Sequence, residues 1–164
     1  MSSPSATVSA LACRLVETAG ELAAHHAVRR RVFVLDQRLF PGDDRDERDG
    51  APDTLHVVGV DRGAVVGAVR LYPLIEGVWQ GDRLAVLPEA RVRHLGALLV
   101  RFAVATAGER GGHTMVAQIQ LPNVRFFEHL GWHADGPADP YHGVMHQPMA
   151  IPLAAAWNSL DPNR

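Results

Sequence analysis

The sequence predicts a single α/β domain whose central sheet contains strands of both directions. Short apolar runs typical of strands alternate with helical patterns along the 164 residues. Two of these runs, 56–61 and 64–73, are joined by Asp61-Arg62-Gly63, a turn typical of an antiparallel hairpin. We expect one domain over 1–164, with its core at about 11–153.

The amino-terminal part predicts a strand followed by a helix. Residues 11–16, LACRLV, form an apolar run typical of a strand. Thr18 and Glu21 have the spacing of a capping box, so a helix is expected from there to about Leu35. The residues expected to face the core are Leu22, Val28, Val32 and Leu35.

Two charged segments are expected to be solvated. One is the polar part of this helix, which contains His25, His26, Arg29, Arg30 and Arg31. The other is the aspartate-rich loop PGDDRDERDGAPD at 41–53, for which flexibility is expected. Calcium binding is the weaker alternative for this loop, because it lacks the spacing of an EF-hand.

Residues 84–102, LAVLPEARVRHLGALLVRF, predict a strand, a short loop and a long helix. The strand, expected over 79–87, ends at Pro88 because proline cannot donate to a sheet. From Leu95 onward apolar residues recur at helical spacing, so the helix begins near His94.

The loop before this helix, 91–97, is suited to an anion. Unpaired N–H groups at a helix start carry about half a positive charge and bind phosphate when small residues allow its approach. An ordinary turn with solvated arginines is the alternative.

The last third predicts a strand at 114–120, a short helix at 123–130 and a further strand at 142–153. Asn123 is the expected N-cap of the short helix, and Gly131 is expected to end it in the left-handed conformation. The prolines of the final segment favour an edge strand.

Composition excludes several classes of function. A net charge of −2 and a pI near 6.5 predict no basic surface for nucleic acid, and no apolar run is long enough for a membrane span. One cysteine, Cys13, and no basic residue in the opening segment predict a cytoplasmic protein without a signal peptide. His129 and His133 have metal-ligand spacing, but Gly131 and Trp132 interrupt it, so no metal is expected.

Two motifs resemble the GNAT acetyltransferase superfamily. Arg91-Val92-Arg93-His94-Leu95-Gly96 is similar to its acyl-CoA motif, Arg/Gln-x-x-Gly-x-Gly/Ala, with His94 replacing the first glycine. Asn123, Phe126-Phe127-Glu128 and Leu130-Gly131-Trp132 resemble the block Asn…Phe-Tyr-Glu-x-Leu-Gly-Phe, with Phe127 where many members carry a tyrosine acid. The resemblance implies a GNAT-type mixed, mostly antiparallel central sheet flanked by helices.

Further motifs are similar to particular branches of the superfamily. Arg31-Val32-Phe33-Val34-x-Asp36-Gln37 and His146-x-x-Met149 resemble the ElaA-like branch, and Arg70-Leu71-x-Pro73 resembles autoinducer synthases. The run Trp79-x-Gly81-x-Arg83-Leu84-Ala85-Val86 and Tyr141-His142-Gly143 are similar to the group encoded beside nitrilases in nitrogen-starvation clusters.

The resemblance implies an N-acyltransferase that moves an acyl group, by default from acetyl-CoA, to the amine of a small polar acceptor. On this interpretation the backbones of Leu84 and Val86 bind pantetheine and the thioester. The pyrophosphate lies on N–H groups of Val92, His94, Gly96 and Ala97, with Arg91 and Arg93 at the rim. Leu95, Asn123 and Phe127 complete the expected cofactor site.

An amine acceptor also needs a proton acceptor, because alkyl amines have a pKa of about 10. His146 is the candidate base and Tyr141 the second catalytic candidate, although His146 could equally satisfy a core hydrogen bond. The candidates for acceptor binding are Arg31, Asp36, Arg70 and Arg83, each of which could instead form an ion pair.

Arg31 and Asp36 are five residues apart, a poor spacing for a pair on one α-helix, so a longer-range partner is expected. A non-catalytic acyl-CoA-binding or regulatory domain is the main alternative function, because both His94 and Phe127 depart from the catalytic pattern. An autoinducer-synthase-like acyltransferase is the other alternative that the resemblance implies. The sequence leaves open the acceptor, the acyl chain and the oligomeric state, with a homodimer among the options.

Overall fold

The computed structural model describes residues 10–153, without the side chains of Val92 and Arg93. Residues 1–9 of the opening segment, on which the signal-peptide prediction rests, lie outside this range. The strands are β1 (Leu11–Leu15), β2 (Leu55–Asp61), β3 (Ala64–Ile75), β4 (Val78–Val86), β5 (Thr114–Gln120), β6 (His133–Ala134), β7 (Asp139–Tyr141) and β8 (Val144–Pro152). The α-helices are α1 (Ala19–Arg29), α2 (Leu95–Glu109) and α3 (Val124–His129).

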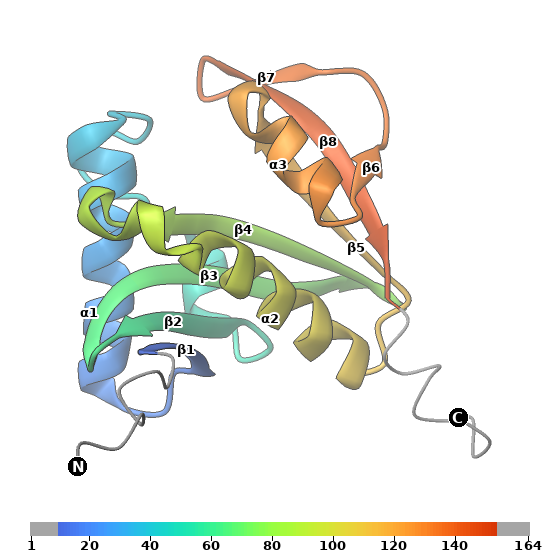
Figure 1. Ribbon diagram of the computed structural model, residues 1–164. Coiled ribbons are helices and arrows are strands. Elements are labelled where there is room, and N and C mark those ends of the chain that lie inside the picture. The colour runs from blue at the N-terminus through green and yellow to red at the C-terminus, as the bar shows by residue number, and fades with distance from the viewer. Residues whose placement is uncertain (1–9, 154–164) are drawn as a thin grey trace, which may run out of the picture.

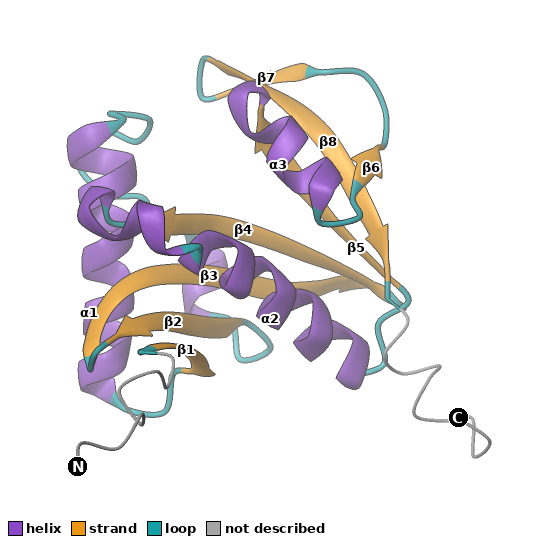
Figure 2. Ribbon diagram, viewed as in Figure 1, coloured by secondary structure: helices purple, strands orange, loops and turns teal. Residues whose placement is uncertain are grey.

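These strands form one sheet in the order β1-β2-β3-β4-β5-β8-β6, with β7 also paired to β8 (Figure 1). Each pairing is antiparallel except that of β4 with β5, which is parallel. The predicted α/β class and mixed, mostly antiparallel sheet are therefore confirmed (Figure 2). Within the described residues, no helix is long and apolar enough to cross a membrane.

Helices cover both faces of the sheet. Successive residues of a strand point to opposite faces. On β3, Ala68 packs in one apolar cluster with Val28 of α1, whereas Val69 belongs to a second cluster with Leu99 of α2. Hence α1 and α2 lie on opposite faces of the sheet.

The first helix changes geometry halfway along. It begins as predicted at Thr18, whose hydroxyl accepts from the Glu21 N–H at 3.0 Å, but α1 gives way to a π-helix, η2 (Arg30–Asp36). A π-helix bonds i to i+5, so Arg31 and Asp36 face each other, with 3.4 Å between Nε and the carboxylate. The predicted longer-range partner is also present, because Arg31 Nη1 lies 3.9 Å from the Glu89 carboxylate, but the local pair with Asp36 was not expected. The widened turn also rotates the helical face, and Leu35, expected in the core, is 55% exposed.

Strand β8 is not the predicted edge strand. It lies between β5 on one side and the short strands β6 and β7 on the other. Pro148 falls between the residues paired with β6 and those paired with β7, so its missing N–H interrupts neither short ladder. Asn123 does occupy the N-cap position of α3, but its side chain makes no capping hydrogen bond.

Candidate functional site

The parallel pair β4 and β5 separates soon after it begins. Only residues 78–80 of β4 pair with β5, and the two strands then diverge (Figure 1). A cavity of about 170 Å³ occupies the opening, with Gly81 and Leu84 on one wall and Ala117 and Ile119 on the other. Because no strand fills the gap, backbone groups along this part of β4 are available to an extended ligand.

Arg83 sits on a β-bulge of β4 at the centre of this opening. The register with β3 shifts between Ala68 and Arg70, and Arg83 has a left-handed φ of 54°. A non-glycine residue in this conformation costs roughly 1–2 kcal/mol, and such strain concentrates at functional sites. The bulge turns the guanidinium of Arg83 into the cavity wall, where Nη1 donates to the Tyr141 hydroxyl at 3.3 Å.

Tyr141 and His146 reach the cavity from β7 and β8. Their rings meet edge to face at 5.2 Å, and His146 is only 4% exposed. The Nδ1 of His146 lies 2.7 Å from the carbonyl of Val144 and therefore acts as the donor, which leaves Nε2 unprotonated in the neutral ring. The cavity thus contains an oriented imidazole that can accept a proton.

The predicted phosphate loop lies at the wide end of the opening. A 3₁₀ turn, η4 (Pro88–Arg93), leads through His94 into α2. Leu98 donates to the His94 carbonyl, so the N–H groups of the three preceding residues, 95–97, lie outside the helix ladder. His94 has a φ of 62°, a conformation that favours glycine, and this explains the glycine of the related motif. Arg91 donates to the Val86 carbonyl at 3.0 Å.

The structure divides the other predicted site residues into two groups. Leu84, Arg83, Asn123, Phe127, Tyr141 and His146 all line the cavity. Arg31, Asp36 and Arg70 are not part of its walls, and each forms the ion pair that was the alternative. Arg83 does both, because it lines the cavity and also pairs with Asp44 and Asp46 at 3.3 Å. Side chains that sequence reasoning missed are Gln37 and Gln120, which are joined by a 3.0 Å hydrogen bond at the cavity wall.

The fold and the cavity allow comparison with known proteins. The family model described as "Acetyltransferase (GNAT) family" matches residues 22–132. The chain belongs to the GNAT acetyltransferase family. The resemblance to the superfamily stated from the sequence motifs is therefore confirmed.

Solved structures share the GNAT fold over nearly their whole length. A protein from Lactobacillus plantarum, described as an N-acetyltransferase, has a TM-score of 0.78 at 23% identity, covering 88% of this chain and 99% of its own. Escherichia coli ElaA has a TM-score of 0.77 at 20% identity, covering 86% and 99%. An acyl-CoA N-acyltransferase from Pseudomonas aeruginosa has a TM-score of 0.74 at 23% identity, covering 86% and 97%. At these identities the likeness establishes the fold.

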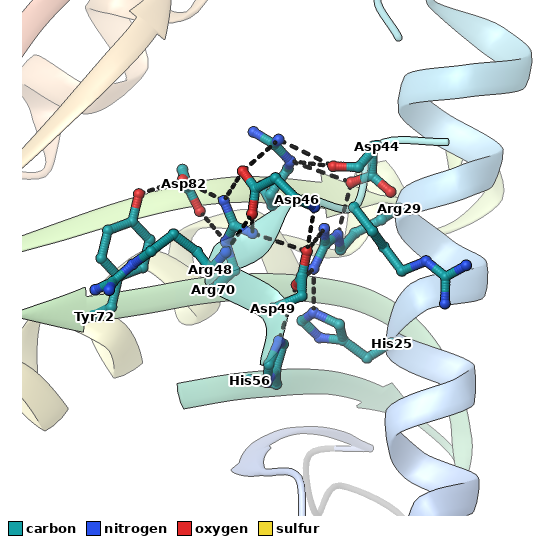
Figure 3. A network of polar contacts seen from close by, with 12 residues as sticks. His25, Arg29, Asp44, Asp46, Arg48, Asp49, His56, Arg70, Tyr72 and Asp82 are labelled. Atoms are coloured by element: carbon teal, nitrogen blue, oxygen red, sulfur yellow. Dashed lines mark hydrogen bonds and ion pairs between the residues drawn. The ribbon is translucent and has the colours of Figure 1, made fainter. Parts of the chain in front are cut away.

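In this GNAT chain a network of buried charges supports the cavity from the α1 face (Figure 3). Arg29 is fully buried and binds Asp44 at 2.7 Å and Asp49 at 2.6 Å. Asp49 also accepts from Arg70 at 3.0 Å, and Arg70 binds Asp82 at 2.7 Å. Since Asp82 lines the cavity, the network connects the helix, the loop and the cavity wall.

This network corrects part of the prediction of two solvated charged segments, although Arg30, Arg31 and most of the loop are exposed as expected. Both His25 and Arg29 have no exposed surface, and Asp44 of the predicted flexible loop is 2% exposed. The loop is fixed because its carboxylates neutralise arginines that would otherwise be buried without partners. His25 also belongs to the charge network, because its Nε2 lies 3.2 Å from Arg29 Nη1, while its Nδ1 lies 2.9 Å from the Val57 carbonyl.

One group of three possible metal ligands exists among the described residues. It consists of His26, Asp49 and His56, with ligand atoms within 4.8 Å of one another. The Asp49 oxygens, however, already accept bonds from Arg29, Arg70 and His56. A metal ion would have to displace a buried arginine, so this group is better explained as part of the charge network.

Burial changes the titration of the network. Desolvation lowers the pKa of His25 to about 3. For Asp49, desolvation raises the pKa, but hydrogen bonds from His56 and Arg29 outweigh it and hold the pKa below its usual value. Both groups therefore favour the folded state more strongly at neutral than at acidic pH.

We expect the protein to lose stability as the pH falls from 7 to 5. The pKa of His25 is about 3 when folded and 6.5 in the unfolded chain, so unfolding takes up a proton in this window. Linkage gives a loss of about 2 kcal/mol between these two pH values. Urea unfolding at pH 7, 6 and 5 measures this loss in the free energy of unfolding. The carboxylates remain largely ionised over this range and therefore contribute little to the change. A free energy of unfolding that does not change would mean that His25 is charged in the fold.

Proposed function

We propose that this GNAT protein is a cytoplasmic N-acyltransferase that transfers an acyl group from acyl-CoA to the amine of a small polar acceptor. The observation that carries the proposal is the cavity between β4 and β5, which is lined by an oriented imidazole and whose β4 wall continues through η4 into an anion-suited helix start. The helix start would bind the phosphates of an acyl-CoA donor, and the imidazole would accept the proton that the amine must lose.

The donor would lie along β4, with its pyrophosphate at the N–H groups of residues 92–97 and its pantetheine beside Leu84 and Val86. Leu87 donates to β3 through Val66, so by strand alternation the N–H of Val86 points to the opening. This direction supports hydrogen bonding to the pantetheine or thioester.

The acceptor would lie on the α1 side, where Arg83, Tyr141 and His146 line the cavity. A neutral amine attacks the thioester carbonyl, the C–N bond forms and the C–S bond breaks. His146 Nε2 takes the proton that the amine nitrogen loses. Only about one alkyl amine in a thousand is neutral at pH 7, so a positioned base is worth a factor of about 10²–10⁴.

The leaving sulfur makes a smaller demand on the enzyme. A thiol of pKa about 8.5 can leave as thiolate at a cost of roughly 2 kcal/mol. Tyr141 would support this step, because its oxygen accepts from Arg83 and its own O–H, which has no acceptor among the described residues, can donate to the sulfur. Phe127, which is 6% exposed and packs on Trp132, would act only as a wall of the site.

A non-catalytic acyl-CoA-binding domain is the second candidate, favoured by the left-handed His94 and by Phe127 in place of tyrosine. Incubation of the protein with acetyl-CoA and a panel of small amines distinguishes the two candidate functions. Amine-dependent release of CoA thiol, with a matching N-acyl product by mass spectrometry, supports the transferase. Binding of the cofactor without turnover of any amine would favour the binding domain.

Gly96→Asp should weaken CoA binding severely, because it adds a negative charge where the phosphates would approach. A Cβ at Gly96 would lie 3.7 Å from Phe126 and 4.0 Å from Val86, so a small side chain fits without disturbing the fold. Gly96→Asn is the matched control of equal size and no charge. Calorimetry should show a much larger loss for aspartate than for asparagine, and equal losses would contradict the phosphate assignment.

A further inference from the structure

The cavity has two chemically different halves. Phe33, Gln37 and Phe40 line it on the α1 face, together with the polar side chains of Arg83 and His146. The walls on the α2 face are apolar side chains from β3, α2, β5 and the segment that contains α3 and Trp132, and they belong to the core cluster on that face. Six of these side chains form what we call the acyl pocket: Val69, Val100, Ala103, Met115, Ala117 and Trp132.

Small residues create the space in the acyl pocket. Ala103 on α2 and Ala117 on β5 are 2% and 7% exposed, yet both border the cavity where core positions normally carry larger side chains. Gly81 adjoins the last paired residues of β4, and a Cβ there would lie 3.6 Å from Met115 Sδ. The closed end of the opening is therefore unfilled by the protein's own side chains.

We propose that the acyl pocket binds the acyl chain of the donor, and that the preferred donor carries an aliphatic chain longer than acetyl. This inference rests on the proposed function, which places the thioester at the bulge of β4. From there the chain can continue into the pocket, while the amine approaches from the polar half.

The polarity of the walls determines which substrate binds in each half of the cavity. A polar amine buried against the six apolar side chains would lose its hydrogen bonds to water without replacing them. An aliphatic chain loses none, and each buried methylene contributes ~0.8 kcal/mol, or about fourfold in affinity. Affinity should therefore rise about fourfold per methylene from acetyl-CoA until the pocket is full.

Calorimetric titration of the full chain with CoA, acetyl-, butyryl- and hexanoyl-CoA tests the inference. The wild type should bind butyryl- and hexanoyl-CoA at least about tenfold more tightly than acetyl-CoA. Ala103→Leu should fill the pocket, leaving acetyl-CoA affinity within about twofold while removing the gain from the longer chains.

Ala107→Leu is the matched control on the same helix. Ala107 has no exposed surface and belongs to the same core cluster, but it does not line the cavity. Overpacking there should lower the melting temperature by more than about 2 °C, whereas Ala103→Leu should not, because its side chain enters existing space. If Ala103→Leu destabilises the protein, Ala117→Val provides a second test of the inference, because it narrows the acyl pocket from β5.

Equal affinity of the wild type for acetyl- and hexanoyl-CoA would overturn the acyl pocket while leaving the proposed transferase intact. An Ala103→Leu or Ala117→Val protein that loses all four ligands equally would overturn it too. No binding even of CoA by the wild type would overturn both the proposed function and this inference.

Discussion

Replacing His146 with glutamine should lower kcat by about 10²–10⁴-fold, the usual contribution of a positioned base. Glutamine can still donate a hydrogen bond to the Val144 carbonyl, but it cannot take a proton from the acceptor amine. The affinity for acyl-CoA should remain nearly unchanged, because His146 lies on the acceptor side of the opening. Steady-state kinetics with the acceptor found in the amine panel measures both effects.

The pH dependence distinguishes a base from a packing residue. An imidazole base gives a rate that rises with pH and then levels, and this rising limb should disappear in His146→Gln. His133→Gln is a suitable control, since His133 is exposed on β6 and outside the cavity wall. A His146→Gln protein that keeps most of its turnover and the wild-type profile would place the base elsewhere.

Replacing Asp49 with asparagine should lower the free energy of unfolding by about 3–5 kcal/mol, the usual cost of breaking a buried ion pair. Asp49 bridges Arg29 and Arg70, whose side chains are 0% and 1% exposed. The substitution removes the charge that both guanidinium groups share and leaves them buried without full compensation. Urea unfolding at pH 7 measures this loss.

Asp43→Asn provides the control within the same loop. Asp43 is half-exposed, and its one ion pair within 10–153 is with the exposed Arg45, so its replacement should change stability by less than about 1 kcal/mol. If the two variants were equally stable, the network would contribute little and the loop would be held by its backbone contacts. Asp49→Asn should also lower the turnover of the enzyme. Asp49 and Asp82 both bind Arg70, and Asp82 lines the cavity, so the substitution alters the cavity wall.

Much of the fold follows from local sequence signals. The hairpin between β2 and β3, the strand ended by Pro88 and the helix beginning after His94 all appear where periodicity and turn residues place them. These signals are reliable because each depends on a few neighbouring residues. The cavity lining containing Leu84, Phe127 and His146 was reached through the family resemblance, since the opening between β4 and β5 depends on contacts between distant segments.

The charge network could have been found from the sequence. His25, Val28, Arg29 and Val32 have the spacing i, i+3, i+4 and i+7, so the two polar residues lie on the same buried face as the two valines. Polar side chains on a buried face require partners of opposite charge, and the nearby aspartate-rich loop supplies them. Composition alone suggested a solvated loop, because composition does not show which carboxylates form ion pairs with buried arginines.

The π-helix had no comparable signal. Its widened turn brings Arg31 and Asp36 together, whereas α-helical geometry separates residues at that spacing. The location of β8 inside the sheet was also hidden, because β6 and β7 are only two and three residues long. Strands this short have no readable alternation.

Hydrogen exchange with a non-transferable thioether analogue of acyl-CoA tests most directly whether the opening between β4 and β5 is the donor site. The account predicts slower exchange in the peptides that cover 84–86 on β4 and 94–97 at the start of α2, where backbone N–H groups would bind pantetheine and pyrophosphate. Gly96→Asp should abolish this protection. Tight binding of the analogue with protection confined to other segments would contradict the account.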